Sequence, residues 1–154
     1  MKNFLSFCLL VFCLQLYSQT DTQKRFQSET RKFYVWNKEV EKYELKDTEY
    51  ENSVIDIREI GSKSNGYIVI SMVDNGLSKL QHGSIYDYKQ TSDNEGSWFV
   101  NSKYMRGKVT YNPKENTITF LYGAEEKRYT KLMIFDVKED KAPNASLKTI
   151  EKFD

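Results

Sequence analysis

Apolar and polar residues alternate along most of the chain beyond residue 32, and this alternation predicts β-strands. It is clearest in 53–60 (SVIDIREI), where isoleucines alternate with charged residues, and in 117–122 (TITFLY), where large apolar residues alternate with threonines. Successive side chains of a strand point to opposite faces, so each stretch predicts a strand with one buried face. The stretch 67–73 (YIVISMV) is apolar on both faces and predicts the most buried strand.

Turn signals separate the expected strands. A proline-containing turn at 112–116 predicts that the strands on either side of it form a hairpin. A turn near Asn37 predicts the same arrangement for 32–36 and 39–45. Gly83 lies within an otherwise strand-like stretch and predicts a bulge or bend there.

The order of these elements predicts the fold class. About eight strands follow one another through short turns, and no long helical stretch is present to connect parallel neighbours, so we expect an all-β antiparallel meander. An up-and-down barrel or half-barrel, lipocalin-like in general architecture, would remove the exposed sheet edges. A two-sheet sandwich and an open curled sheet are the alternatives. Gly96-Ser97-Trp98 has the G-x-W shape found near the start of lipocalins, but it lies past the middle of this chain, so membership of that family is not inferred.

The N-terminal segment is typical of a secretory signal peptide. Lys2 precedes an apolar run over 4–16 that is too short to span a bilayer. We expect residues 1–18 to be removed by cleavage after Ser18, with cleavage after Thr20 or an uncleaved membrane helix as alternatives. The expected location is outside the cytoplasm, secreted or periplasmic, in a bacterial cell envelope, with no membrane span left after cleavage.

The remaining chain predicts a single domain. Residues 19–31 are polar and are expected to form a flexible lead-in, and 32–138 the β domain. Residues 139–154 are expected to be a charged tail or a short helix, since Leu147, Ile150 and Phe153 recur at helical spacing.

Composition excludes several kinds of chemistry. Both cysteines, Cys8 and Cys13, lie in the predicted signal peptide, so the mature chain has no thiol for a disulfide, a nucleophile or a metal site. Without Lys2 the acidic and basic residues are equal in number, and they are interspersed, which argues against a nucleic-acid partner.

Few residues suggest catalysis or metal binding. His82 is the only histidine, and no G-x-S-x-G elbow accompanies it, so a strand residue beside Gly83 is favoured over a hydrolase base. Asp47, Glu49 and Glu51 alternate and would share one face of an extended chain, where a solvated acidic edge is favoured over a Ca²⁺ site. We therefore expect no enzyme activity, no metal and no cofactor.

Aromatic residues are the richest source of a binding site, because their faces stack on sugars or line apolar cavities. The candidate ligand-binding residues are Trp36, Trp98, Tyr86, Tyr88 and Tyr111, of which Tyr86 and Tyr88 are expected to share one strand face. Core packing is the competing interpretation and is favoured about two to one. The expected function is non-enzymatic binding of a small apolar or saccharide ligand by these aromatics. The alternative is an envelope protein–protein interaction module.

The signal-peptide interpretation gives a first prediction. Protein recovered after export from a Gram-negative host should begin at Gln19 and contain no titratable thiol, because both cysteines leave with the leader. Intact mass and N-terminal sequencing measure this. An N-terminus at Met1 or a Cys8–Cys13 crosslink in the purified protein would contradict it.

Overall fold

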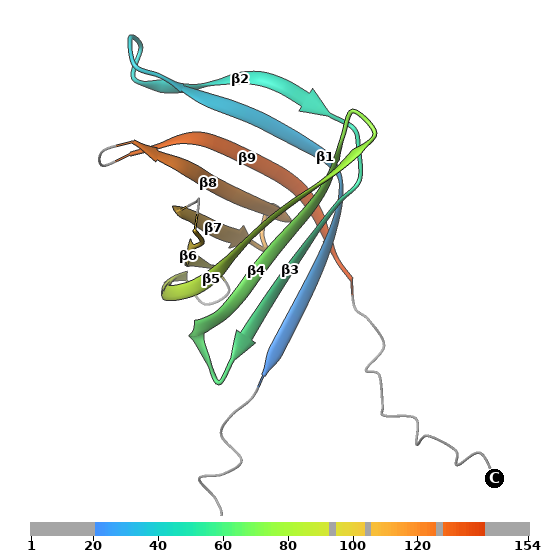
Figure 1. Ribbon diagram of the computed structural model, residues 1–154, viewed down its shortest axis with the longest axis vertical. Coiled ribbons are helices and arrows are strands. Elements are labelled where there is room, and N and C mark those ends of the chain that lie inside the picture. Colours follow the sequence, from blue (N-terminus) through green and yellow to red (C-terminus); the bar gives the residue numbers. More distant parts are fainter. Residues whose placement is uncertain (1–20, 93–94, 104–105, 126–127, 141–154) are drawn as a thin grey trace, which may run out of the picture.

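The computed structural model describes residues 21–92, 95–103, 106–125 and 128–140 of the chain (Figure 1). The described residues form nine strands and no helix, so no helix among them could cross a membrane. The strands are β1 (Thr22–Asn37), β2 (Lys42–Glu49), β3 (Ser53–Ile60), β4 (Ser62–Asp74), β5 (Leu77–Ser92), β6 (Glu95–Asn101), β7 (Arg106–Asn112), β8 (Thr117–Glu125) and β9 (Arg128–Glu139). The predicted signal peptide and residues 141–154 of the predicted tail lie outside the described residues.

Eight of the strands close into an antiparallel up-and-down barrel, which confirms the predicted fold class. The sheet order is β2-β1-β3-β4-β5-β6-β7-β8-β9, and β1 also pairs with β9. This closing pair runs from Phe26 opposite Glu139 to Val35 opposite Lys131. Closure removes the free edges that an open meander of this length would leave exposed.

The barrel wall is divided at one end, because two strands share one edge of β1. Residues 22–28 of β1 pair with β3, whereas residues 31–37 pair with β2. Strand β4 follows β3 as far as the pair Ser53–Met72 and does not pair with β2. We call the end of the barrel where β2 and β4 diverge the split end; Figure 1 shows the β1/β2 and β4/β5 hairpins separating there.

The barrel interior is a continuous apolar core supplied by every second residue of the strands. The buried hydrophobic residues are Phe26, Ile55, Ile57, Ile68, Ile70, Met72, Ile85, Trp98, Val100, Val109, Ile118, Phe120, Phe135 and Val137. The alternation predicted in 53–60 and 117–122 is confirmed, since both stretches bury the expected face. Each fully buried large side chain contributes roughly 1.5–3 kcal/mol through removal of apolar surface from water.

The start of the domain differs from the sequence expectation. The polar stretch up to Arg31 was expected to be a flexible lead-in, but it forms the first half of β1, held between β3 and β9. Only Phe26, Ser28 and Arg31 are buried in this half-strand. This stretch contains only one large apolar residue, so its sequence gives no local signal for a strand. Its strand conformation depends on pairing with β3 and β9.

Gly83 has a different role from the predicted bulge or bend. The β4–β5 register passes through Gly83 without a shift. A Cβ atom at this position would lie 3.1 Å from the Val100 Cβ atom, so glycine allows β5 and β6 to approach closely inside the barrel. The irregularities of β5 instead fall between Ile85 and Asp87 and between Gln90 and Ser92.

The inward and outward faces of β9 give a prediction. Phe135→Ala should lower the free energy of unfolding by about 3–5 kcal/mol, because Phe135 is fully buried. Asp136→Ala, at the next position but exposed, should change it by no more than about 0.5–1 kcal/mol. Urea unfolding followed by circular dichroism measures both. Equal losses would contradict the register of the closing pair.

Candidate functional site

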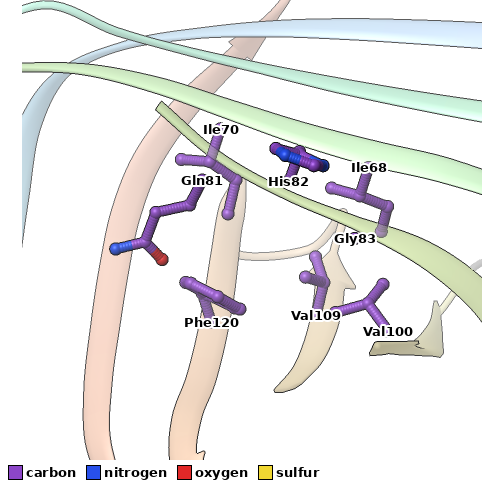
Figure 2. Close-up of a pocket in the computed structure, with 8 residues that line it drawn as sticks. All are labelled: Ile68, Ile70, Gln81, His82, Gly83, Val100, Val109 and Phe120. Atoms are coloured by element: carbon purple, nitrogen blue, oxygen red, sulfur yellow. The ribbon is translucent and has the colours of Figure 1, made fainter. Parts of the chain in front are cut away.

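The middle of the barrel is filled by its own side chains. The space enclosed by β4, β5, β6, β7 and β8 amounts to about 10 Å³, which is room for about one water molecule at most. Figure 2 shows Ile68, Ile70, Val109 and Phe120 converging on this space. A ligand cannot enter the middle of the barrel without displacing the core.

A cavity of about 240 Å³ lies at the split end. One part of its wall is apolar and consists of Phe33, Met72 and Met133. The polar part of the wall consists of Arg31, Glu49, Asp74, Lys79, Gln81 and Tyr122. These residues come from six strands, because the inward positions of β1, β2, β4, β5, β8 and β9 meet where the wall divides.

Arg31 is the most buried polar group of this site, with 2% of its surface exposed. Its Nη1 donates to Ser53 Oγ at 3.1 Å, and its Nη2 donates to the Val73 carbonyl. The same Nη2 forms an ion pair with Glu49 and lies 3.9 Å from Glu51 Oε2. A single guanidinium therefore connects β1 to β2, β3 and β4 across the divided wall.

Several acceptor oxygens near Arg31 are buried without a hydrogen-bond donor among the described residues: Glu49 Oε2, Glu51 Oε2 and Gln81 Oε1. The two carboxylates face Arg31 as charges, whereas the Gln81 oxygen has no such counter-ion. In Figure 2 the Gln81 amide is directed away from Val100 and Val109. An unmet buried acceptor costs about 1–3 kcal/mol, so these oxygens favour a bound donor.

Two further groups line the cavity. Burial raises the pKa of the Tyr122 hydroxyl, and the nearby amide group of Gln81 and the charge of Arg31 oppose this rise, so the phenol is neutral at pH 7. The hydrogen bond from Lys79 holds the pKa of the Asp74 carboxyl below its ordinary value, so this carboxylate is charged.

The opposite end of the barrel is closed by aromatic rings. Trp98, with only 3% of its surface exposed, packs against Tyr88 at a ring-centroid distance of 5.4 Å. Its Nε1 donates to Glu59 Oε1 at 2.9 Å, and Thr22 Oγ1 donates to Glu59 Oε2 at 2.6 Å. Lys24 Nζ lies 6.0 Å from the Trp98 ring centroid.

The structure does not bring the five predicted aromatic site residues together. Trp98 and Tyr88 are in contact, and Tyr111 packs against Phe26 at 4.7 Å. Trp36 contacts Tyr43 on the β1/β2 hairpin and has the Arg128 guanidinium 4.0 Å from its ring centroid. Tyr86 is 56% exposed and lies 6.3 Å from Phe99. None of the five lines the split-end cavity, and their contact with a ligand stays a prediction.

Tyr86 and Tyr88 do not share a face, contrary to the expectation from their spacing. The β5–β6 register shifts between Ile85 and Asp87, so Tyr86 is the extra residue of a bulge. The bulge reverses the alternation, and Tyr88 therefore turns inward to Trp98.

The structure also places the predicted catalytic and metal-binding candidates, His82 and the acidic row. His82 is exposed and makes no side-chain hydrogen bond or ion pair with another described residue. Of the predicted acidic row, Glu49 and Glu51 face Arg31, while Asp47 Oδ1 accepts a hydrogen bond from the backbone of Thr48. Within the described ranges, no group of three His, Cys, Asp or Glu side chains is placed to hold a metal ion.

Comparisons with known proteins add no identification. No family model matches this chain, and no curated protein and no solved structure matches it either. The site is therefore interpreted from its own geometry.

The Arg31 cluster gives a stability prediction with a control on the same strand. Arg31→Met should lower the free energy of unfolding by about 1–3 kcal/mol, because it leaves the Val73 carbonyl and two partly exposed carboxylates without their donor. Arg25→Met removes an exposed ion pair with Asp56 and should cost about 0–1 kcal/mol. Urea unfolding at pH 7 measures both losses.

Adding Glu49→Gln and Glu51→Gln to Arg31→Met should recover more than half of the lost stability, since the unpaired charges are then absent. A loss in Arg31→Met no larger than that in Arg25→Met would contradict the cluster.

Proposed function

We propose that this protein is an exported, non-enzymatic binding protein that holds one small molecule in the split-end cavity. The observation that carries the proposal is the contrast between the filled middle of the barrel and the cavity of about 240 Å³ at one end. The cavity wall has an apolar side and a larger polar side with an unmet acceptor, so it offers a small molecule both apolar contact and hydrogen bonds.

The cavity volume limits the size of the ligand. An apolar cavity of about 150 Å³ in a protein accepts a benzene-sized molecule, and sites for drug-sized ligands begin near 300 Å³. The value of about 240 Å³ lies between these limits. The ligand is therefore a small amphiphilic molecule, with its apolar part against Met72 and Met133 and its polar part toward Gln81.

A protein–protein interaction module is the second candidate, supported by the free edge of β2. This strand pairs only with β1, and Leu45 on it is 52% exposed. However, the β1–β2 register shifts at Lys46, and a bulge with a lysine at the edge is a common protection against strand addition. The cavity is thus the better supported site.

Binding of 1-aminoanthracene, a neutral probe that fluoresces when it leaves water, tests the proposal. The wild-type protein should show a saturable fluorescence increase. Met133→Trp fills the cavity and should weaken binding by about tenfold or more, a loss of about 1.4 kcal/mol. Leu132→Trp, at the next position on the outer face of β9, is the control and should bind within about twofold of wild type.

Two outcomes would contradict the proposal: no saturable binding by the wild-type protein, or equal binding by wild type and Met133→Trp. Thermal unfolding of each variant confirms that it is folded. Stoichiometric retention of a partner protein by a protein that binds no probe would favour the second candidate.

A further inference from the structure

The contacts of Arg31 occupy both hydrogens of Nη2, so this nitrogen has no free donor for an anionic ligand. Nη1 and Nη2 already donate to Ser53 and Val73, and the Glu49 carboxylate is in contact with Nη2. A ligand carboxylate would have to displace Glu49 from this nitrogen. It would also leave the Glu49 charge beside the ligand charge in a partly buried site, where like charges repel strongly.

In contrast to the donors of Arg31, the acceptor groups of the cavity wall lack hydrogen-bond donors in the described part of the chain. Gln81 Oε1 is buried and has no donor among the described residues, and Glu49 Oε2 has only its ion-pair contact with Arg31. Both residues line the cavity. A ligand that donates hydrogen bonds at this wall satisfies the Gln81 acceptor, which the described residues leave without a donor, and can share the Glu49 carboxylate with Arg31.

The charged residues that line the cavity balance one another, and one more carboxylate lies beside them. Glu49 and Asp74 line the cavity together with Arg31 and Lys79. Glu51 lies outside this lining, with its Oε2 3.9 Å from Arg31 Nη2, and adds one further negative charge. Lys79 is already paired with Asp74 at the rim. An added positive charge would therefore neutralise the site.

The apolar wall suits the body of such a ligand. Met72 and Met133 are flexible, polarisable side chains that adapt to ligand shape, and the rings of Phe33 and Tyr122 can receive a cation on their faces. The cavity thus joins acceptors and negative charge to an apolar surface.

On the basis of the proposed function, we propose that the ligand is a small apolar amine, bound as its ammonium ion. The ammonium group donates to Gln81 Oε1 and Glu49, and the hydrocarbon body lies against Met72 and Met133. An ammonium has three donors and no acceptor, which matches a wall whose unmet groups are acceptors.

Displacement of 1-aminoanthracene by three molecules of equal chain length tests this inference at pH 7. Hexylamine is cationic under these conditions, hexanol is neutral and hexanoate is anionic. Hexylamine should displace the probe at a concentration at least about tenfold lower than hexanoate. Hexanol should lie between them, because it donates one hydrogen bond but carries no charge.

Two variants assign the effect to the proposed groups. Glu49→Gln should weaken hexylamine binding by about tenfold and leave hexanol within about twofold, because it removes charge and little volume. Glu44→Gln is the matched control, since Glu44 pairs with Lys46 elsewhere on β2, and it should not change hexylamine binding. Gln81→Leu removes the uncharged acceptor and should weaken hexylamine and hexanol alike.

Each outcome either supports or overturns the inference. Displacement by hexanoate at concentrations equal to or below those of hexylamine would overturn it and leave the proposed function intact. Equal displacement by all three molecules would show that only the hexyl chain is recognised and that water satisfies the acceptors, and this would also overturn the inference. Probe binding that no hexyl compound reverses would also overturn it. Absence of probe binding to the wild-type protein would instead remove the proposed function itself.

Discussion

The ion cluster of Arg31 is the interaction on which the split end depends. Strand β1 has 16 residues and needs two successive partners along one edge, β3 and then β2. At the point where β3 ends and β2 begins along this edge, Arg31 contacts Ser53 of β3, Glu49 of β2 and Val73 of β4. It thereby connects both partner strands to β4. Burying a guanidinium costs several kcal/mol unless carboxylates and hydrogen bonds offset it. These contacts supply that offset, and they hold the two diverging hairpins on either side of the cavity.

Side-chain volume along the barrel axis explains where the space lies. Phenylalanine and β-branched residues such as Phe120 and Ile70 fill the middle. At the split end the inward positions are taken by the unbranched side chains of Met72 and Gln81, and β4 does not pair with β2 there. The largest ring, Trp98, closes the opposite end. Aromatic side chains thus seal this barrel, and the open volume is bounded mainly by methionine and charged residues.

Much of the fold could be predicted from the sequence, because one-sided alternation is a local property. The hairpin at 112–116 and the buried face of 53–60 were predicted for this reason and are confirmed. The first half of β1 could not be predicted, since its polar pattern becomes a strand only through partners as distant as β9. The bulge at Tyr86 could not be predicted either. One extra residue moves the following side chains to the other face of the strand, and nothing in the local composition indicates it.

The candidate site could be predicted only in part. The acidic alternation that includes Glu49 and Glu51 is interpreted from the sequence as a solvated edge, because its cation, Arg31, lies in the stretch that the sequence predicts to be flexible. No spacing rule connects these residues, because strand pairing alone brings them together. The sequence favours aromatic residues as the ligand-binding groups because of their chemistry, yet the nine cavity-lining residues include none of the five predicted aromatics.

The two ends of the barrel differ in how their buried polar groups are satisfied. At the closed end, both oxygens of Glu59 accept hydrogen bonds, from Trp98 and from Thr22, so this carboxylate is a completed structural element. At the split end, the Gln81 oxygen has no donor in the described part of the chain. Native proteins rarely leave such groups unmet, and the exceptions concentrate at functional sites. The proposed ligand is therefore placed at the split end, where the described residues leave an acceptor without a donor.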